Sequence, residues 1–401
     1  MDNDILFAGL DELGKSLEGD IKYDTITRTI YSTDASDYKE RPSAVIYPKG
    51  ESDIRKILLF ASKYIAGVTM RAAGTSLAGQ VVSSGIIIDI SRYMNKIIEI
   101  NREERWVTVQ PGVVLDELNL VLKKYGLFFG PETATSNRCT IGGMVGNNSC
   151  GSHSVVYGST REHTLELNTF LSDGSEAVFG SLNNDEFERK CKLENLEGDI
   201  YRNIKKILDD PLNKKTIAED YPDPLIPRRN TGYALDLLAD SSVFNERSEK
   251  KFNFCKLLAG SEGTLAAITL IKLNLVPLPP AHKALVCIHH NERNEAFKAN
   301  LVALAHGPSA VEMTDNRILE LTKNNISQRK NRFFLIGDPG AITIVEFARN
   351  TVEELNKATS ELIMELISKG YGCLPGSNRK GYQQSMGFKK GRIRCFEKHE
   401  R

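Results

Sequence analysis

A run of small residues at positions 71–80 constrains the fold of this chain more than any other feature. The run reads Arg71-Ala72-Ala73-Gly74-Thr75-Ser76-Leu77-Ala78-Gly79-Gln80 and directly follows the strand-like residues 68–70. Small side chains allow consecutive backbone N–H groups to point into one concavity, where they can bind phosphate oxygens. The outer glycines have the spacing of a Walker A loop, but Gln80 and Val81 replace its lysine and hydroxyl residue, which disfavours a nucleoside triphosphatase. An ordinary glycine-rich turn is the alternative interpretation of this run taken alone.

The composition predicts a soluble, globular protein of two domains. The chain has 401 residues, 41% of them hydrophobic, and 52 basic side chains balance 52 acidic ones. It can therefore bury a sizeable core, and it has no basic surplus that would attract nucleic acid. The acidic start lacks the positive region of a signal peptide, and no apolar run approaches the ~20 residues of a membrane helix, so we expect a cytoplasmic location.

The sequence contains no recognisable metal site. Its seven cysteines are widely spread and include no Cys-x-x-Cys pair. His289 and His290 are adjacent on an expected strand, where neighbouring side chains face opposite ways, and no His-Glu-x-x-His motif accompanies them. We therefore expect free thiols, a packed or solvated histidine pair, and neither an iron–sulfur cluster nor a structural zinc ion.

Apolar periodicity predicts an α/β architecture for the first part of the chain. A leader helix over residues 4–19 is followed by a βαβ unit made of strand 44–47, helix 51–64 and strand 68–70. The run 71–80 therefore follows the end of a strand, where anions are commonly bound. A second α/β layer, separate from the first, is predicted from strands 85–90, 97–100 and 105–109 and a helix over 113–122.

A second stretch rich in Gly, Ser, Thr and Asn occupies residues 131–151. A structureless loop of this length inside a compact domain is usually functional, although a disordered linker is the alternative. The pair Gly142-Gly143 allows a flat ligand to approach the backbone closely, and the amides of Asn147 and Asn148 could bond to ring edges.

The remainder of the chain contains a third glycine-rich motif and then a change of pattern. Residues 181–256 are charged and helix-prone, and Gly260-Ser261-Glu262-Gly263-Thr264 precedes an expected strand over 265–276. The proline cluster at 277–280 is the expected domain boundary. Beyond it we expect an antiparallel sheet with helices on one face, from strands 284–289 and 342–347 and helices 294–306, 315–323 and 352–369.

A hydrolase is the rival class suggested by the third motif. Residues 259–263 loosely match a nucleophile elbow, with Ser261 as the nucleophile. That motif needs a strand before the serine and a helix after it, whereas a strand is expected after Ser261.

Taken together, the motifs resemble the FAD-binding domain of the vanillyl-alcohol oxidase and p-cresol methylhydroxylase family. The resemblance is closest to the FAD-linked dehydrogenases that act on D-lactate, glycolate and D-2-hydroxyglutarate. It rests on residues 71–79, 131–136, 140–151, 157–158, 230–233 and 261–265, in this order along the chain. The string 31–36 looks most like the long members, in which an iron–sulfur module follows the flavin half.

The resemblance implies an α+β protein in which two α/β subdomains hold FAD between them, with a partial antiparallel-sheet cap. It divides the chain into a helical leader (1–40), an FAD-binding domain of the p-cresol methylhydroxylase type (41–278) and a cap (279–401). The cofactor should be noncovalent, because Ala72, Ala73 and Gly74 stand where some relatives carry a flavin-linked histidine.

The resemblance also assigns roles to individual residues. It places Arg229, Asn230 and Tyr233 on the substrate side, and it assigns no catalytic residue. The residues that it places around FAD are Arg71, Ala72, Ala73, Gly74, Thr75, Ser76, Gly79, Gln80, Pro131, Thr133, Thr140, Ile141, Gly142, Gly143, Gly146, Asn147, Asn148, Gly151, Tyr157, Gly158, Glu262, Gly263 and Ile268.

The implied reaction is oxidation of a D-2-hydroxyacid to the 2-oxoacid by hydride transfer to flavin N5. Electrons would pass on to a quinone or a carrier protein, which leaves peripheral membrane association open. The family's cap normally supplies a carboxylate-binding arginine and a His-x-Gly-Asp-Gly-Asn-x-His motif, and neither is visible here. Because residues 386–401 no longer resemble the family, we expect a truncation or frame change near residue 385, and the alternative function is an inactive FAD-binding remnant.

Overall fold

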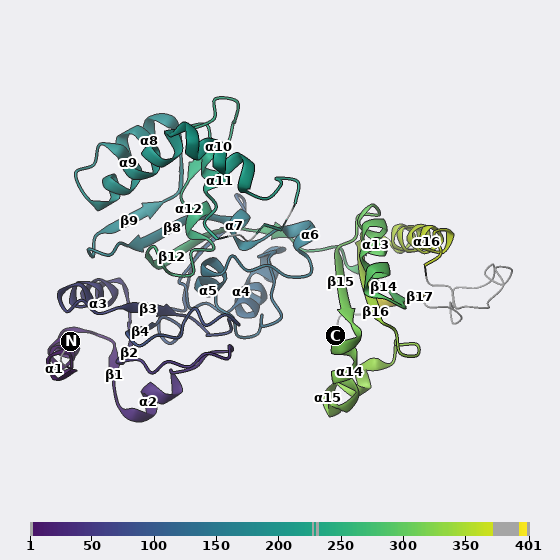
Figure 1. Cartoon of the computed structure of the whole chain (residues 1–401), viewed down its shortest axis with the longest axis horizontal. Helices are drawn as coiled ribbons and strands as arrows, with labels where there is room; N and C mark the ends of the chain where they lie inside the picture. The colour runs from purple at the N-terminus through teal and green to yellow at the C-terminus, as the bar shows by residue number, and fades with distance from the viewer. Residues whose placement is uncertain (1–2, 227, 230–231, 372–392, 399–401) are drawn as a thin grey trace. The chain divides into compact units, whose positions relative to one another are not determined.

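A computed structural model describes residues 3–226, 228–229, 232–371 and 393–398 (Figure 1). The chain divides into two compact units: unit 1 comprises Met1–Gly151 and Gly158–Pro277, and unit 2 comprises Ser152–Tyr157 and Leu278–Arg401. The chain therefore leaves unit 1 twice, once at the proline cluster and once at residues 152–157, where the sequence carries no boundary signal. Within the described residues, no helix is both long enough and apolar enough to cross a membrane.

The first sheet of unit 1 has four strands. Their order across the sheet is β1 (Asp20–Lys22), β2 (Ala44–Tyr47), β4 (Ile86–Asp89) and β3 (Val68–Arg71). Both β2 and β3 run parallel to β4, whereas β1 is antiparallel to β2. Helices α1 (Asn3–Ser16) and α3 (Glu51–Lys63) bury their apolar faces in the core that this sheet forms. The expected leader helix and βαβ elements are confirmed.

The assignment of residues 85–90 to a second layer is wrong. Strand β4 lies between β2 and β3 in the first sheet, so the βαβ unit is split by a third parallel strand. All its residues, Ile86, Ile87, Ile88 and Asp89, are buried. A strand with no exposed face is typical of the interior of a parallel sheet, which explains why the continuous apolar run fits here rather than at an edge.

The second sheet of unit 1 is antiparallel and brings distant segments together. Its order is β5 (Ile97–Asn101), β6 (Trp106–Val109), β12 (Ala267–Asn274), β8 (Thr164–Phe170) and β9 (Glu176–Phe179). Burial alternates along β12, as expected for a strand with one core face. Its core contains the aromatic cluster Phe187, Tyr201, Phe252 and Phe254, whose rings meet edge to face.

The helices of unit 1 beyond the first sheet fill the rest of its core. They are α4 (Leu115–Leu122), α7 (Thr160–His163), α8 (Asn184–Cys191), α9 (Leu196–Asp209), α10 (Pro211–Asp220), α11 (Leu235–Ala239) and α12 (Cys255–Leu258). The smaller elements are α2 (Thr25–Ile30), the 3-10 turn η1 (Lys123–Tyr125), and the short strand pairs β7 (Leu127–Phe128) with β13 (Val276–Pro277) and β10 (Ser181–Leu182) with β11 (Phe252–Asn253).

The stretch 131–151 is not structureless. Helix α5 (Ile141–Gly146) forms inside it and buries Ile141, Met144 and Val145 in the core. These three apolar residues are spaced at i, i+3 and i+4, which is the pattern of one helical face. The two central glycines hide that pattern from a reading based on composition.

Unit 2 contains an antiparallel sheet with helices on one face, as predicted. Its strand order is β15 (Ala310–Asp315), β16 (Ala341–Arg349), β14 (His282–His290) and β17 (Ile393–Lys398). Helices α13 (Arg293–Leu304) and α16 (Val352–Ser368) pack on alternate residues of β14 and β16, including Val286 and Phe347. Strand β15 was not predicted. The other elements are α6 (Ser154–Tyr157), α14 (Asn316–Asn324), α15 (Ile326–Arg329) and η2 (Lys330–Arg332).

Asp53 fixes the N-terminal segment onto the first sheet, and its removal should destabilise the fold. The buried carboxylate accepts backbone N–H bonds from Glu18, Gly19 and Lys49 at 2.9–3.0 Å. Asp53→Ala leaves these donors without an acceptor, so we expect the free energy of unfolding to fall by about 3 kcal/mol. Chemical denaturation of the apoprotein measures this change. Glu12→Ala, which removes an exposed ion pair with Lys15, should shift the transition little, and equal effects would contradict the role of Asp53.

Candidate functional site

The first glycine-rich loop leaves β3 in a conformation that its glycines make possible. Gly74 and Gly79 have φ values of 64° and 77°, in the left-handed region that favours glycine. The Ser76 hydroxyl donates to Gln80 Oε1 across the loop. The loop is half-buried to exposed, so its backbone is accessible to a ligand.

Residues 31–36 hold this loop from one side. The Ala35 N–H donates to Gly74 O at 3.1 Å. The Arg71 guanidinium donates to Thr33 O at 2.9 Å and lies over the Tyr31 ring at 5.0 Å from its centroid. Arg71 therefore fixes the start of the loop to its neighbour.

Helix α5 is the point at which all three glycine-rich motifs meet. A Cβ added to Gly143 would lie 3.1 Å from Ala72 Cβ, which places the first loop directly against the helix. At the other end of α5, the Gly260 N–H donates to Val145 O and the Glu262 N–H donates to Gly146 O, both at 2.9 Å. Motifs that are far apart in the sequence thus contact the same helix.

Thr140 carries an unpaired hydroxyl at the start of α5. Its side chain is 3% exposed, and its Oγ1 has no hydrogen-bond partner among the residues that the structure describes. A buried polar atom without a partner costs stability, so a retained one often marks a ligand contact. This hydroxyl fits a group with oxygen acceptors, as FAD has.

A cavity of about 280 Å³ lies between the two sheets of unit 1. Residues 68–70 of β3 form part of its wall, with Phe170 and Ala267 at the ends of β8 and β12. Gln80 of the first loop and Glu262 and Gly263 of the third motif also line it. The cavity therefore joins two of the predicted cofactor-binding segments.

The paired asparagines after α5 have different environments. Asn147 is exposed. Asn148 is 2% exposed, and its Oδ1 accepts from Ser159 Oγ and from the Arg161 N–H, both at 2.8 Å. Asn148 therefore holds α7 against α5, a role that the sequence pattern did not suggest.

Arg161 is a functional candidate that the sequence reasoning missed. Its guanidinium is buried and donates to Ala259 O at 2.7 and 3.0 Å and to Gly232 O at 3.4 Å. Burial lowers the pKa of this guanidinium, while the charges of Glu162 and Asp236 oppose the change. Arg161 thereby connects the loop around Gly232 to the third motif. The sequence signal that could have identified Arg161 is its position three residues after Gly158, which is one of the predicted cofactor residues.

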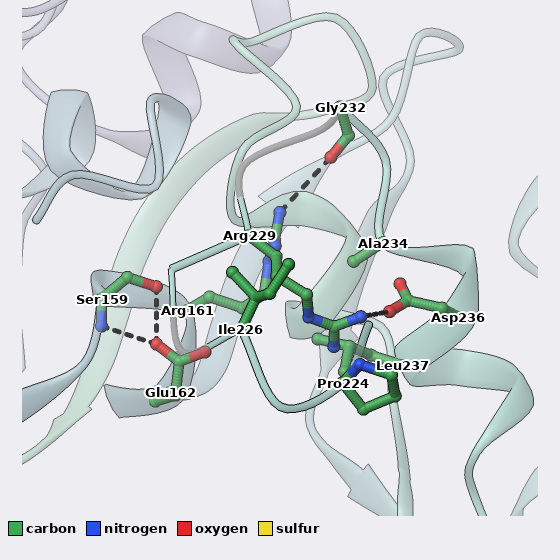
Figure 2. Close-up of a pocket in the computed structure, with 10 residues that line it drawn as sticks. All are labelled: Ser159, Arg161, Glu162, Pro224, Ile226, Arg229, Gly232, Ala234, Asp236 and Leu237. Atoms are coloured by element: carbon green, nitrogen blue, oxygen red, sulfur yellow. Dashed lines mark hydrogen bonds and ion pairs between the residues drawn. The ribbon is translucent and has the colours of Figure 1, made fainter. Parts of the chain in front are cut away.

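One of the three predicted substrate-side residues, Arg229, lies at a second cavity of about 180 Å³ (Figure 2). Arg229 lines it, but its guanidinium already forms a 2.5 Å ion pair with Asp236 and donates to Pro222 O. The Tyr233 hydroxyl lies 2.7 Å from Thr264 Oγ1, next to the third motif. Asn230 lies outside the described residues.

The other predicted cofactor residues take varied positions. Pro131 is buried, Thr133 Oγ1 donates to Cys139 Sγ at 3.3 Å, and Ile268 lies half-buried on β12. Gly151 packs against Glu132 and Gly158 has φ 67°, whereas Tyr157 belongs to α6 of unit 2.

The rival readings fit this geometry poorly. Helix α12 precedes Ser261 and strand β12 follows the motif, which is the reverse of a nucleophile elbow. The Ile336 N–H donates to His289 Nε2, and His290 Nε2 lies 3.0 Å from Thr343 Oγ1, so both histidines are packed in unit 2. No group of His, Cys, Asp and Glu in the described part of the chain could hold a metal ion.

Comparison with known proteins matches the part of the chain that contains the first two glycine-rich stretches. Residues 42–180 match the family model of the FAD binding domain. This segment is therefore similar to FAD-binding domains. It contains β2, α3, β3, the first loop and α5, and Ala72 of that loop lies against Gly143 of α5.

Curated relatives extend the similarity to most of the chain. D-2-hydroxyglutarate dehydrogenase of Pseudomonas putida is 34% identical over 87% of this chain, and that of Haemophilus influenzae is 36% identical over 90%. The chain spans about a third of the length of these relatives, 34% and 35%. The expected resemblance to FAD-linked D-2-hydroxyacid dehydrogenases is confirmed. A solved structure of alkyldihydroxyacetonephosphate synthase has a TM-score of 0.60 at 17% identity and covers 91% of this chain and 60% of its own, which shows a shared fold.

Gly143→Val should abolish FAD binding without unfolding the protein. The added branches would intrude between α5 and Ala72, where the Cβ alone already lies 3.1 Å from Ala72 Cβ. We expect the purified variant to stay colourless after incubation with FAD. Gly67→Val is the control, because a Cβ at Gly67 meets nothing within 4 Å. Normal FAD binding by Gly143→Val would show that this contact lies away from the cofactor.

Thr140→Val should separate cofactor affinity from stability. Because Thr140 Oγ1 has no partner, its replacement by a methyl group should leave the apoprotein equally or more stable. If this hydroxyl donates to FAD, the dissociation constant should rise about tenfold. Thr169→Val is the matched control: its buried hydroxyl donates to Ala177 O, so that variant should lose stability and keep its affinity for FAD. Unchanged affinity in Thr140→Val would refute the contact.

Proposed function

We propose that this chain binds FAD noncovalently between the two sheets of unit 1. The observation that carries the proposal is the meeting of the three glycine-rich motifs at α5, within and beside the FAD-binding domain. Backbone amides of residues 72–76 would bind the pyrophosphate, and the Thr140 hydroxyl would donate to a cofactor oxygen. Because Gly142 and Gly143 have no side chains, α5 would pack closely against Pro111 and Ala72, next to the loop that binds the cofactor. Ala72, Ala73 and Gly74 offer no side chain for a covalent link.

The cavity between the sheets supports a position for the remaining part of the cofactor. Gln80, Glu262 and Gly263 line this cavity and belong to the predicted cofactor residues. A carboxylate and an amide are suitable partners for ribose hydroxyls and adenine edges. Unit 1 would thus form the FAD-binding domain, with one α/β subdomain around each sheet, and unit 2 the cap.

The proposed reaction is oxidation of a D-2-hydroxyacid to a 2-oxoacid. Its support is the similarity to curated D-2-hydroxyglutarate dehydrogenases over most of this chain. Bound FAD would supply the hydride acceptor, N5, and the electrons would then pass to a quinone or a carrier protein. D-2-hydroxyglutarate, D-lactate and glycolate are the substrates to test.

The substrate-side residues of this chain would position the hydroxyacid substrate, but Arg229 would not neutralise the substrate carboxylate with a free charge. Asp236 already neutralises Arg229, so this pair would fix the backbone at Arg229. The exposed Tyr233, joined to Thr264, would present its ring beside the third motif. No residue of the described chain is assigned as the catalytic base.

Anaerobic addition of a D-2-hydroxyacid should bleach the yellow FAD-loaded protein. Hydride transfer to bound FAD removes its visible absorbance, so an absorption spectrum measures the reaction directly. We expect bleaching by at least one of D-2-hydroxyglutarate, D-lactate and glycolate, and none by L-2-hydroxyglutarate or L-lactate. Bleaching by NADH alone would point to a different reductase, and bound FAD that no hydroxyacid reduces would favour the inactive remnant.

A further inference from the structure

The turn at residues 259–264, which carries the third glycine-rich motif, has an unusual backbone. Gly260, Glu262 and Gly263 have φ values of 94°, 55° and 75°, all in the left-handed region. Glycine adopts this region readily, but the side chain of Glu262 makes it unfavourable there. A backbone of this kind persists only where its surroundings hold it. The contacts of the turn therefore decide whether it keeps its shape.

This turn forms part of the wall of the cofactor cavity proposed above. Glu262, Gly263 and Thr264 line the cavity of about 280 Å³ between the two sheets of unit 1. If the turn changed its shape, these residues would move relative to the rest of the wall. The shape of the turn therefore affects how well a ligand fits in the cavity.

Backbone groups on both sides of the turn are held by hydrogen bonds within unit 1. The N–H groups of Gly260 and Glu262 donate to the last two carbonyls of α5, both at 2.9 Å. The Arg161 guanidinium binds the carbonyl that precedes them, since its Nη2 and Nε donate to Ala259 O at 2.7 and 3.0 Å. Arg161 therefore supplies the anchor that α5 does not provide.

The Arg161 side chain is itself held in place. It is 4% exposed, its backbone N–H donates to Asn148 Oδ1 at 2.8 Å, and its Nη2 also donates to Gly232 O at 3.4 Å (Figure 2). A Cβ added to Gly260 would lie 2.6 Å from Arg161 Nη2, so the guanidinium packs directly against the turn. Because the planar guanidinium is already oriented, it loses little further entropy when it binds the carbonyl.

We propose that Arg161 is a positioning residue for the cofactor: by binding Ala259 O, it keeps the turn 259–264 in the shape that binds FAD. This inference rests on the proposed binding of FAD in the cavity between the two sheets. A turn that already has its bound shape loses less conformational entropy when the ligand arrives. Arg161 therefore raises the affinity for FAD without touching it.

The first test replaces Arg161 and measures FAD affinity by fluorescence titration of the full chain. Arg161→Met removes the hydrogen bonds but keeps an unbranched side chain in the buried site. We expect its dissociation constant to rise about tenfold, the effect of losing one charge-assisted hydrogen bond. Arg161→Lys should recover part of the affinity, because its ammonium group can still donate to Ala259 O.

Arg202→Met is the matched control. Arg202 Nη1 also donates to main-chain carbonyls, those of Cys191 and Leu193 at 2.6 and 2.7 Å, but these lie elsewhere in unit 1. This variant should bind FAD as the unmodified chain does. Thermal unfolding of each apoprotein separates lost affinity from lost folding.

The second test is chemical rescue, which a merely structural role would not predict. Arg161 lines the cavity of about 180 Å³, so in Arg161→Ala the space of the lost side chain adjoins that cavity. Methylguanidinium should enter this space, donate to Ala259 O and restore most of the lost FAD affinity. It should not improve Arg161→Met, whose side chain fills the same space. If Arg161→Ala does not fold, Arg161→Met and Arg161→Lys decide the question.

The outcomes distinguish this inference from the proposed function. Three results would overturn the positioning role: equal affinities of Arg161→Met and the unmodified chain, equal losses in Arg161→Met and Arg202→Met, or a loss in folded Arg161→Ala that methylguanidinium does not reduce. In each case FAD binding by the unmodified chain would stand. Failure of the unmodified chain to bind FAD would instead refute the proposed function.

Discussion

Two backbone hydrogen bonds at the end of α5 hold the candidate site together. The last carbonyls of a helix have no partners within the helix, and here the N–H groups of Gly260 and Glu262 supply them. Because the donors come from a segment more than a hundred residues away, helix capping and assembly of the site are the same event. The first loop then meets the same helix only because Gly143 has no side chain.

The polar side chains around these loops differ in whether their polar atoms already have partners within the protein. Arg229 is neutralised by Asp236, and Asn148 gives its side-chain oxygen to two donors, so both mainly fix the local backbone. The buried side-chain atoms without a partner in the described residues are Thr140 Oγ1 and Asp34 Oδ2. Asp34 adjoins Ala35, which bonds to the first loop, so both unpaired atoms border the predicted cofactor loops.

The elements that apolar periodicity predicted well are those whose burial follows one face. Strand β2 and helix α3 were found almost residue for residue, because neither contains a breaking residue. Strand β15 was missed because Glu312, Thr314 and Asp315 interrupt its apolar character. Helix α5 was missed because its two central glycines look like loop residues, although Ile141, Met144 and Val145 carry the helical spacing. Sheet membership of β4 could not be predicted, since strand pairing depends on the chain beyond local pattern.

For the site, sequence motifs predicted which segments belong together, but not which of their side chains face a ligand. The three motifs do meet, and the glycines stand where backbones approach closely. Asn148 turned inward and Arg229 found a carboxylate because such orientations depend on tertiary neighbours that the motifs do not contain. Arg161 owes its interest to a partner about a hundred residues away along the chain, Ala259.

The late arrival of β12 has a consequence for how unit 1 forms during synthesis. β6 pairs with β12 across more than 150 residues of chain, and β8 pairs with β12 on its other side. Until residues 260–274 leave the ribosome, α5 lacks the donors that end it, and the facing edges of β6 and β8 stay unpaired. Such non-local pairing slows folding, and open strand edges invite association between chains. The segments that form the cofactor site therefore stay exposed on the nascent chain until the last of them has been synthesised. This interval is the natural point for chaperones to act.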